Sequence, residues 1–304
     1  MSAEAAAPRR AAFLGLGAIG APMAGHLASA YALTVWNRTA ARAQAFVAAH
    51  PAARAAATPR EAVAGADVVL TCLPTSHEVM ALLDGPDGVA AGLAPGALFL
   101  DCTSGDPATS RALHARLAAL GVAYADCPVS GGTNGAAAGT LTVMVGADAD
   151  TFARAEPVLR AFGRRIEHMG PVGAGDAMKA VNNTLLALNI AGFAEGMVAL
   201  AKAGVPAAQA VAVLNASSGR SFVSEVLVPE RVLTGTYPVT FRLALLDKDV
   251  GIGLDVLREA GLDGPVLAAV KARFAEARAA LGEDADYLHL IRLVEARAGA
   301  LLRA

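Results

Sequence analysis

The sequence has few cysteines, few aromatic residues and no block of charge of one sign. Cys72, Cys102 and Cys127 are an odd number of cysteines without a CxxC pair. This predicts small core residues in a reducing cytoplasm rather than a disulfide framework, and no metal site is expected. A formal net charge of −2 without a basic cluster predicts no binding to nucleic acid. We therefore expect small-molecule partners.

The sequence also shows no long hydrophobic run. Arg, Asp, Glu or Gly interrupts each apolar stretch before the ~20 residues that a membrane span needs. The segment Met1–Arg10 has its arginines after its alanines and leads directly into a strand pattern, unlike a secretory signal. We expect a soluble, cytoplasmic protein that is neither exported nor bound to a membrane.

The length of 304 residues favours two domains, because single hydrophobic cores rarely grow beyond about 250–300 residues. Up to about Gly170, short apolar runs alternate with helical patterns, which predicts a mainly parallel sheet with helices on both faces. Pro59 after Thr58 and Pro107 after Asp106 mark helix starts. Strands are expected at Ala11–Leu16, Leu33–Trp36, Asp67–Cys72, Ala97–Cys102, Val122–Cys127 and Thr140–Gly146.

Beyond about Gly170, Ala, Leu and Val recur at helical spacing. The stretch Asp176–Lys202 is long enough to form one interdomain helix, with Gly204-Val205-Pro206 as its stop signal. An α/β domain at residues 1–172 and an all-α domain at residues 173–304, joined through this long helix, are therefore predicted. Further helices are expected at Leu243–Ala260, Pro265–Leu281 and Tyr287–Leu302.

A glycine-rich turn follows the first predicted strand and opens a helix. In the dinucleotide fingerprint GxGxxG, the first glycine makes the tight turn, the second lets a pyrophosphate approach, and the third lets helix and strand pack. The flanking strand and helix supply the context that this fingerprint requires, so residues 1–172 are predicted to be a Rossmann domain. The expected cofactor contacts are Gly15, Leu16, Gly17, Ala18, Ile19 and Gly20.

The end of the second strand bears on the choice between NAD and NADP. An NAD enzyme usually has Asp or Glu here to bond the ribose 2′-hydroxyl, but this chain has Asn37. Asn37, Arg38 and Thr39 suit a 2′-phosphate, because Arg stacks on adenine and bonds phosphate oxygens. The alternative is that Arg38 is a solvated residue before the next helix. NADP is predicted rather than NAD.

Two further strand ends are expected at the same crevice. Leu73 and Pro74 follow one strand, and Thr103 and Ser104 follow the next. Ligands of Rossmann sheets lie at these carboxyl ends, so we expect the four residues to line the nicotinamide and its ribose. The alternative is that both are ordinary turns.

A second glycine-rich segment, Ser130-Gly131-Gly132, is too rich in glycine to continue the strand before it. Backbone N–H groups without side chains in front of them make an anchor for a carboxylate. The alternative is a simple turn between two strands.

Lys179 and Asn183 stand four residues apart near the start of the long helix and share one face. Apolar neighbours such as Met178, Leu186 and Ile190 predict partial desolvation, which lowers the pKa of a lysine and suits it to exchange a proton with a carbonyl oxygen. Asn183 is expected to orient the lysine or to bond the same oxygen. From spacing alone, such a pair is more often structural than catalytic.

Together these motifs resemble the β-hydroxyacid dehydrogenase family, which includes 3-hydroxyisobutyrate dehydrogenase, tartronate semialdehyde reductase and glyoxylate/succinic semialdehyde reductase. The resemblance spans nearly the whole chain. Small departures are Ile19 for a common Met, Cys127 for a common Ala, and Thr103-Ser104 for the usual Ser-Thr. The motifs stand in the family's order at Gly15–Met23, Asp126–Gly132, Gly173–Asn183 and Phe241–Asp249.

The resemblance implies roles for individual residues. Lys179 is implied as the catalytic acid and base, with Asn183 in support, and Ser130, Gly131 and Gly132 as the holders of the substrate carboxylate. Ser104 is implied to touch cofactor and substrate. Lys248 is implied to close over the nicotinamide, with Phe241 and Asp249 nearby at the substrate.

The implied activity is hydride transfer between NADP(H) and a small 3-hydroxy acid or its aldehyde acid, of the 3-hydroxyisobutyrate, tartronate semialdehyde, succinic semialdehyde or glyoxylate type. A homodimer or homotetramer built through the helical domain is implied as well. One alternative is an imine reductase, but such enzymes replace the lysine that this chain keeps at Lys179. Another is a non-catalytic nucleotide-binding interaction module, which has no need for Lys179, Asn183 and the Ser-Gly-Gly segment together.

Overall fold

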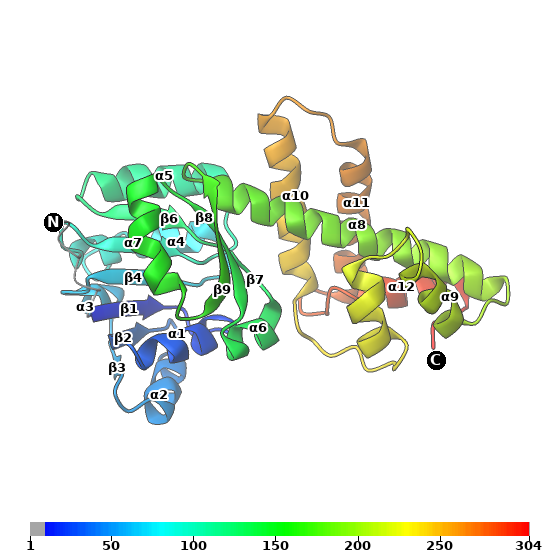
Figure 1. Ribbon diagram of the computed structural model, residues 1–304, viewed down its shortest axis with the longest axis horizontal. Helices are drawn as coiled ribbons and strands as arrows, with labels where there is room; N and C mark the ends of the chain where they lie inside the picture. The colour runs from blue at the N-terminus through cyan, green and yellow to red at the C-terminus, as the bar shows by residue number, and fades with distance from the viewer. Residues whose placement is uncertain (1–9, 304) are drawn as a thin grey trace. The chain divides into compact units, whose positions relative to one another are not determined.

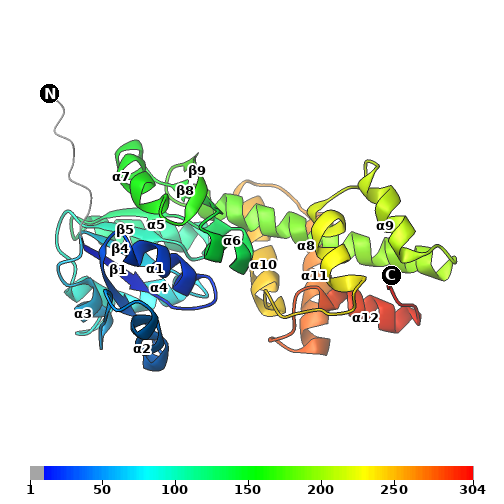
Figure 2. The same ribbon diagram turned by 60° about the horizontal axis from the view of Figure 1, so that its bottom comes forward.

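The computed structural model describes residues 10–303 (Figures 1 and 2). The prediction that the protein is not exported rests on Met1–Arg10, and most of this segment lies outside the described residues. The chain forms two compact units that divide between Lys179 and Ala180, inside helix α8 (Ala174–Lys202). The boundary expected from the sequence, between residues 172 and 173, falls just before that helix. We refer to the two parts as unit 1 and unit 2.

Unit 1 is built on one sheet with the strand order β3-β2-β1-β4-β5-β6-β8-β7, and β9 pairs with β8. Pairing is parallel except where β8 meets β6 and β7. The order reverses between β1 and β4, and ligands of such sheets bind at the carboxyl ends beside this reversal. The strands are β1 (Arg10–Leu14), β2 (Ala32–Trp36), β3 (Arg54–Ala55), β4 (Val68–Thr71), β5 (Leu98–Asp101), β6 (Ala123–Asp126), β7 (Val129–Ser130), β8 (Leu141–Gly146) and β9 (Gly163–Gly170).

Helices cover both faces of this sheet (Figures 1 and 2). Alternate residues of β1 enter two separate cores, Phe13 in one and Leu14 in the other, as the twofold repeat of a strand requires. Helices α3 and α5 begin at Pro59 and Pro107, as predicted. The helices are α1 (Gly20–Ala28), α2 (Ala40–Ala49), α3 (Pro59–Val63), α4 (Ser76–Leu82), α5 (Pro107–Ala118), α6 (Gly132–Ala138) and α7 (Ala149–Leu159), with a 3₁₀ turn at Val89–Ala91.

The central strands end level with one another. Leu14 pairs with Thr71, Thr71 with Asp101, and Asp101 with Asp126, so the last residues of β1, β4, β5 and β6 lie in one row across the sheet. The loops that follow these strands therefore start side by side. This row places the predicted cofactor segments along one edge of unit 1.

Every regular element described in residues 180–303 is a helix. Buried Leu, Val, Ile and Phe side chains of these helices form a single core. The fold is thus a Rossmann-like α/β unit followed by an all-helical unit. Besides α8, the elements are α9 (Ala207–Asn215), the π-helix η2 (Val223–Val232), α10 (Leu243–Glu259), α11 (Pro265–Leu281) and α12 (His289–Ala298).

Helix α8 corrects one expectation. It is long and apolar enough to cross a membrane by length and composition alone, with a mean hydropathy of 1.6. The sequence was expected to contain no apolar run of this length. Glu195 and two nearby glycines do interrupt the stretch, but its mean hydropathy remains that of a possible membrane span. Side chains such as Ile190 and Met197 are buried in the core of unit 2. The helix therefore has a packing role inside a folded domain.

Candidate cofactor and proton-transfer site

The glycine-rich turn between β1 and α1 has the geometry that a pyrophosphate needs. A Cβ at Gly15 would lie 2.3 Å from the carbonyl oxygen of Cys72, and one at Gly20 would lie 2.0 Å from the carbonyl oxygen of Gly15. Both positions therefore require glycine. A Cβ at Gly17 would meet no atom within 4 Å, so the backbone there is open to a ligand. The first turn of α1 also carries no acidic residue, which suits an anion.

Asn37 braces this turn. Its Oδ1 accepts from the backbone N–H of Leu16 over 2.9 Å, and its Nδ2 donates to the carbonyl oxygen of Thr39 over 3.0 Å. The amide thus joins the glycine-rich turn to the segment before α2, a role that the sequence had not indicated.

Arg38 and Thr39 stand beside Asn37 at the end of β2. The side chain of Arg38 is 84% exposed, and its Nη1 lies 3.5 Å from Oε1 of Glu78 in α4. Thr39 precedes the first residue of α2, and its side chain makes no capping bond to that helix. A guanidinium, a hydroxyl and a helix start therefore occur together where the predicted 2′-phosphate would lie.

Thr103 and Leu73, from the two loops expected to line the nicotinamide, are hydrogen-bonded to each other. The N–H of Leu73 donates to Oγ1 of Thr103 over 3.0 Å, and the N–H of Thr103 donates to Oδ1 of Asp101 over 3.0 Å. Burial raises the pKa of Asp101, while hydrogen bonds from Thr103 and Thr71 act to lower it. Thr103 is buried, whereas Ser104 is half-buried and Pro74 is exposed. Asp101 was missed in the sequence, although a carboxylate closing an apolar strand was a signal.

The Ser-Gly-Gly segment differs from the simple turn considered as an alternative. Ser130 pairs with Thr142 as the last residue of β7, and Gly132 is the first residue of α6. Gly131 and Gly132 have φ of +136° and +63°, backbone conformations that side chains disfavour. A Cβ at Gly132 would meet no atom within 4 Å, so this backbone too is open to a ligand.

The start of α8 is held by two buried carboxylates. The N–H groups of Gly173 and Asp176 donate to Oδ1 and Oδ2 of Asp126 over 2.7 and 2.9 Å. Asp176 in turn accepts from the N–H of Gly105 over 3.0 Å and from the hydroxyl of Ser110 over 2.6 Å. Sequence reasoning assigned no role to either aspartate.

Burial dominates the electrostatics of these two carboxylates. It raises the pKa of Asp126 to about 6, against the lowering effect of its backbone hydrogen bonds. Burial, and then the charge of Asp126, raise the pKa of Asp176 well above its usual range. Two adjacent carboxylates in a low dielectric resist ionising together.

Lys179 follows these contacts on the first turns of α8 and is half-buried. The apolar surroundings expected for it are present only in part. Ile190 is buried and Leu186 half-buried, but Met178 is 43% exposed. Met178 precedes Lys179 directly, and adjacent helical residues point in different directions, so it does not share the face of the lysine.

In unit 2, three predicted site residues lie together. Nδ2 of Asn183 donates to Oδ2 of Asp249 over 2.6 Å, and Nζ of Lys248 lies 2.9 Å from Oδ1 of the same carboxylate. Asn183 and Asp249 are both buried. The fourth, Phe241, packs against the core of unit 2 and contacts the ring of Tyr287 at 5.7 Å between centroids.

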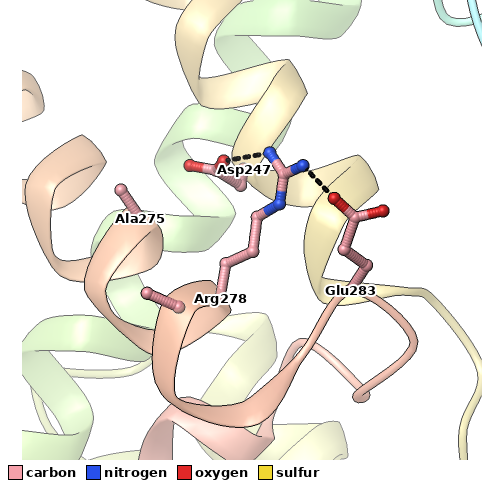
Figure 3. A pocket seen from close by; sticks show the side chains of 5 residues that line it. Asp247, Ala275, Arg278 and Glu283 are labelled. Atoms are coloured by element: carbon pink, nitrogen blue, oxygen red, sulfur yellow. Dashed lines mark hydrogen bonds and ion pairs between the residues drawn. The ribbon is translucent and has the colours of Figure 1, made fainter.

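A separate pocket of about 350 Å³ lies in unit 2 and contains none of the predicted site residues (Figure 3). Its only cationic side chain, Arg278, donates to Asp247 over 3.3 Å and pairs with Glu283. Among the lining residues two carboxylates face one guanidinium, so the pocket lining has no excess positive charge to bind a substrate carboxylate. Its lining residues are Asp247, Ala275, Arg278, Ala279 and Glu283.

The described residues include no group of three or more His, Cys, Asp or Glu side chains placed to hold a metal ion. Cys72, Cys102 and Cys127 are free thiols. Burial raises the pKa of Cys72 to about 12 and that of the other two well above the usual range. At neutral pH these cysteines are therefore protonated, with Cys102 and Cys127 buried in the core and Cys72 packed against it.

Comparison with family models gives two matches. Residues 10–170 match the NAD binding domain of 6-phosphogluconate dehydrogenase. Residues 173–294 match a model described as NAD-binding of NADP-dependent 3-hydroxyisobutyrate dehydrogenase. The first match alone covers more than half of the chain.

Individual relatives agree with these models. The chain is 40% identical to NAD-dependent L-serine dehydrogenase of Pseudomonas aeruginosa over 85% of this chain and 88% of that protein. It is 35% identical to 2-(hydroxymethyl)glutarate dehydrogenase of Eubacterium barkeri over 94% and 95%. A solved structure of Mycobacterium tuberculosis 3-hydroxyisobutyrate dehydrogenase with L-serine superposes with a TM-score of 0.84 at 33% identity, covering 95% of this chain and 99% of that one. By these matches the chain belongs to the β-hydroxyacid dehydrogenase family and is an NAD(P)-dependent enzyme acting on the CH–OH group of hydroxy acids.

Proposed function

We propose that the protein transfers a hydride between NADP(H) and a small 3-hydroxy acid or its aldehyde acid, with Lys179 as the proton-transfer residue. The observation that carries this proposal is the contact of Asn183 with Asp249 and of Asp249 with Lys248. These residues come from two distant motifs, and Asn183 stands one helical turn after Lys179 on α8. The cluster thus brings together residues for which the family resemblance implies roles at the substrate and the nicotinamide.

The names of the relatives favour one substrate pattern. L-Serine, 2-(hydroxymethyl)glutarate and 3-hydroxyisobutyrate all have the form HOCH₂–CH(R)–COO⁻ and differ only in R, which is an ammonium, a carboxyethyl or a methyl group. Reduction of tartronate semialdehyde gives a product of the same form, with a hydroxyl as R. We therefore propose a 3-hydroxypropanoate with a small substituent at carbon 2. Succinic semialdehyde and glyoxylate do not fit this form.

The substrate carboxylate is assigned to the segment Ser130–Gly132. The open backbone at Gly132 supports this assignment, because N–H groups without a side chain in front of them can reach carboxylate oxygens. Ser104 follows β5, whose carboxyl end lies next to that of β6 in the sheet. It is proposed to contact the substrate and the cofactor. Phe241, Lys248 and Asp249 are proposed as the contribution of unit 2.

When bound, the nicotinamide supplies or accepts the hydride. As a hydride reaches the aldehyde carbon, negative charge develops on the oxygen, and Lys179 donates a proton to it. In the oxidative direction the neutral amine of Lys179 removes the hydroxyl proton. Asn183, held by Asp249, orients this exchange.

The preference for NADP rests on the end of β2. Arg38, the hydroxyl of Thr39 and the start of α2 suit a phosphate, and no carboxylate stands in place of Asn37. One relative is named NAD-dependent, and one family model is named for an NADP-dependent enzyme. We propose that Arg38 favours NADP in this chain.

We also propose a cytoplasmic homodimer or homotetramer assembled through unit 2. This proposal is supported by the large apolar side chains on the described surface of unit 2, which a second copy could cover. Those with the highest exposure are Val213, Phe222, Val239, Leu262, Val266 and Leu301.

The substrate proposal is tested with purified protein, NADP or NAD, and a panel of hydroxy acids followed by nicotinamide absorbance. We expect the highest kcat/KM with NADP and a compound of the form HOCH₂–CH(R)–COO⁻. Highest activity with succinic semialdehyde or glyoxylate would overturn the substrate pattern. Reduction of cyclic imines in preference to aldehyde acids would favour an imine reductase. Cofactor binding without turnover of any compound would favour a non-catalytic nucleotide-binding module.

A further inference from the structure

Two buried carboxylates, Asp126 and Asp176, connect three segments of unit 1. Asp126 ends β6 and accepts from two N–H groups at the start of α8. Asp176 lies in the first turn of α8 and accepts from Gly105 after β5 and from Ser110 in α5. Gly105 directly follows Ser104, and Lys179 comes three residues after Asp176. The two carboxylates thus fix the first turn of α8 against the loop that carries Ser104.

The hydrogen bonds distinguish the two aspartates. Both oxygens of Asp126 face backbone N–H groups, which can only donate, so Asp126 is best placed to act as a carboxylate. Oδ2 of Asp176 instead faces the hydroxyl of Ser110 over 2.6 Å. A hydroxyl can accept as well as donate. Asp176 is therefore the carboxyl that can carry a proton and donate it to Ser110, while its Oδ1 still accepts from Gly105.

The surroundings add mainly negative or neutral groups. Besides burial, the charge of Asp101 at the end of the neighbouring strand β5 raises the pKa of Asp176. The charges of the aspartates in turn add to burial in raising the pKa values of Tyr124 in β6 and of Cys127. The side chain of Tyr124 is fully buried, and hydrogen bonding to Ser110 lowers its pKa against the raising effects of burial and of the aspartates. Two cationic residues belong to the same region: Nη1 of Arg111 lies near Gly173, and Lys179 stands about one turn after Asp176 on α8.

We propose that Asp126 and Asp176 are positioning residues for proton transfer by Lys179, with Asp126 acting as a carboxylate and Asp176 as a neutral carboxylic acid. The part that concerns Lys179 rests on the proposed function. Loss of either contact would let the first turn of α8 shift relative to Ser104. A displacement of about 1 Å in such a site costs on the order of 10²-fold in rate.

Asparagine substitutions separate the two roles. In Asp126→Asn, the amide NH₂ would face one of the two N–H donors, so we expect kcat to fall by about 10²-fold while KM for NADP, set by contacts at residues 15–20 and 37–39, stays near its original value. In Asp176→Asn, the amide oxygen accepts from Gly105 and the NH₂ donates to Ser110. We expect kcat to fall in Asp176→Ala and to stay close to the original value in Asp176→Asn.

The pH dependence of the melting temperature gives a readout that Lys179 chemistry does not affect. The folded-state pKa values of Asp126 and Asp176 lie above the unfolded value of about 3.9. Their contribution to stability is therefore complete below about pH 4 and is lost as pH rises through about 6 and beyond. We expect Asp176→Asn to weaken this decline, and Asp150→Asn, which removes an exposed carboxylate of α7, to leave it unchanged.

The outcomes are distinct. Equal loss of kcat in Asp176→Asn and Asp176→Ala would overturn the neutral role of Asp176, and so would an unchanged pH dependence of the melting temperature in Asp176→Asn. If Asp126→Asn does not fold, the comparisons between the two Asp176 variants still test the proposal. A Lys179→Ala enzyme with normal kcat would remove the proposed function but leave the melting result standing.

Discussion

The side-chain amide of Asn183 donates to the carboxylate of Asp249 over 2.6 Å, and both side chains are buried. This contact ties α8 to α10. The carboxylate of Asp249 also forms an ion pair with Lys248. One carboxylate therefore contacts residues from two motifs that lie far apart in the sequence.

Asn183→Ala should destabilise unit 2, because it leaves a buried carboxylate without one of its donors. A hydrogen bond to a charged group contributes roughly 1.5–3 kcal/mol, so we expect the free energy of unfolding to fall by about that amount. Asn182→Ala is the control, because the half-buried Asn182 donates to the neutral Oδ1 of Asn183 and its loss leaves the bond from Asn183 to Asp249 in place. Urea unfolding measures both. Equal losses in the two variants would contradict the role given to Asp249.

Gly17→Ala and Gly20→Ala should fail in different ways. The added methyl at Gly20 would overlap the carbonyl oxygen of Gly15, so we expect a lower melting temperature. At Gly17 the methyl has free space in the protein but would stand where the pyrophosphate approaches. Gly17→Ala should keep its melting temperature and lose cofactor affinity at least about tenfold. Unchanged cofactor affinity in Gly17→Ala would argue against the assigned phosphate position.

Arg38→Ala should raise KM for NADP by about tenfold to a hundredfold and leave KM for NAD nearly unchanged, because it removes a charge-assisted bond to the 2′-phosphate. Glu78→Gln should have the opposite effect on NADP, though smaller, since its ion pair with Arg38 is exposed. Arg54→Ala, an exposed arginine of β3, serves as the control. An unmutated enzyme that strongly prefers NAD would refute this assignment.

Light scattering of the dilute protein should give the mass of a dimer or tetramer. The physical reason is the exposed apolar surface of unit 2, including Phe222 and Val239. Replacing Phe222 with Ser should shift the protein toward smaller species if this surface forms the contact. A stable and fully active monomer would exclude the proposed assembly.

The sequence predicted the central strands of unit 1 well because they are continuous apolar runs. It missed β3 and β7, which have only two residues each, and β9, which is polar because it pairs only with β8. Predicted strand ends also ran long: β1 ends at Leu14 rather than Leu16, because the glycine turn begins at Gly15. Strand periodicity cannot reveal such short or polar edge segments.

The helical unit was predicted less completely. The span Pro265–Leu281 agrees with α11, whereas α12 covers His289–Ala298 rather than Tyr287–Leu302. Helix α9 and the π-helix Val223–Val232 were not predicted, the latter because its hydrogen-bond pattern leaves no distinct sequence period.

The glycine-rich turns and the pair of Lys179 and Asn183 were visible as motifs, because each has a local spacing. The contacts made by the carboxylates of Asp126 and Asp176 could not be predicted from the sequence. Asp126 reaches Gly173, and Asp176 reaches Gly105, across more than forty residues of sequence. Such contacts depend on which strands are neighbours and on their register, and a single sequence does not define these.

Lys179→Ala tests the central claim most directly. The variant should fold, because Lys179 is a half-buried helical side chain, and fluorescence titration should show NADPH affinity near that of the original enzyme. With the proton donor gone, kcat measured by nicotinamide absorbance should fall by about 10²–10⁴-fold, and Lys179→Arg should fail nearly as badly because a guanidinium does not release its proton near neutral pH. A folded Lys179→Ala enzyme that keeps most of its kcat would contradict the proton-transfer role of Lys179.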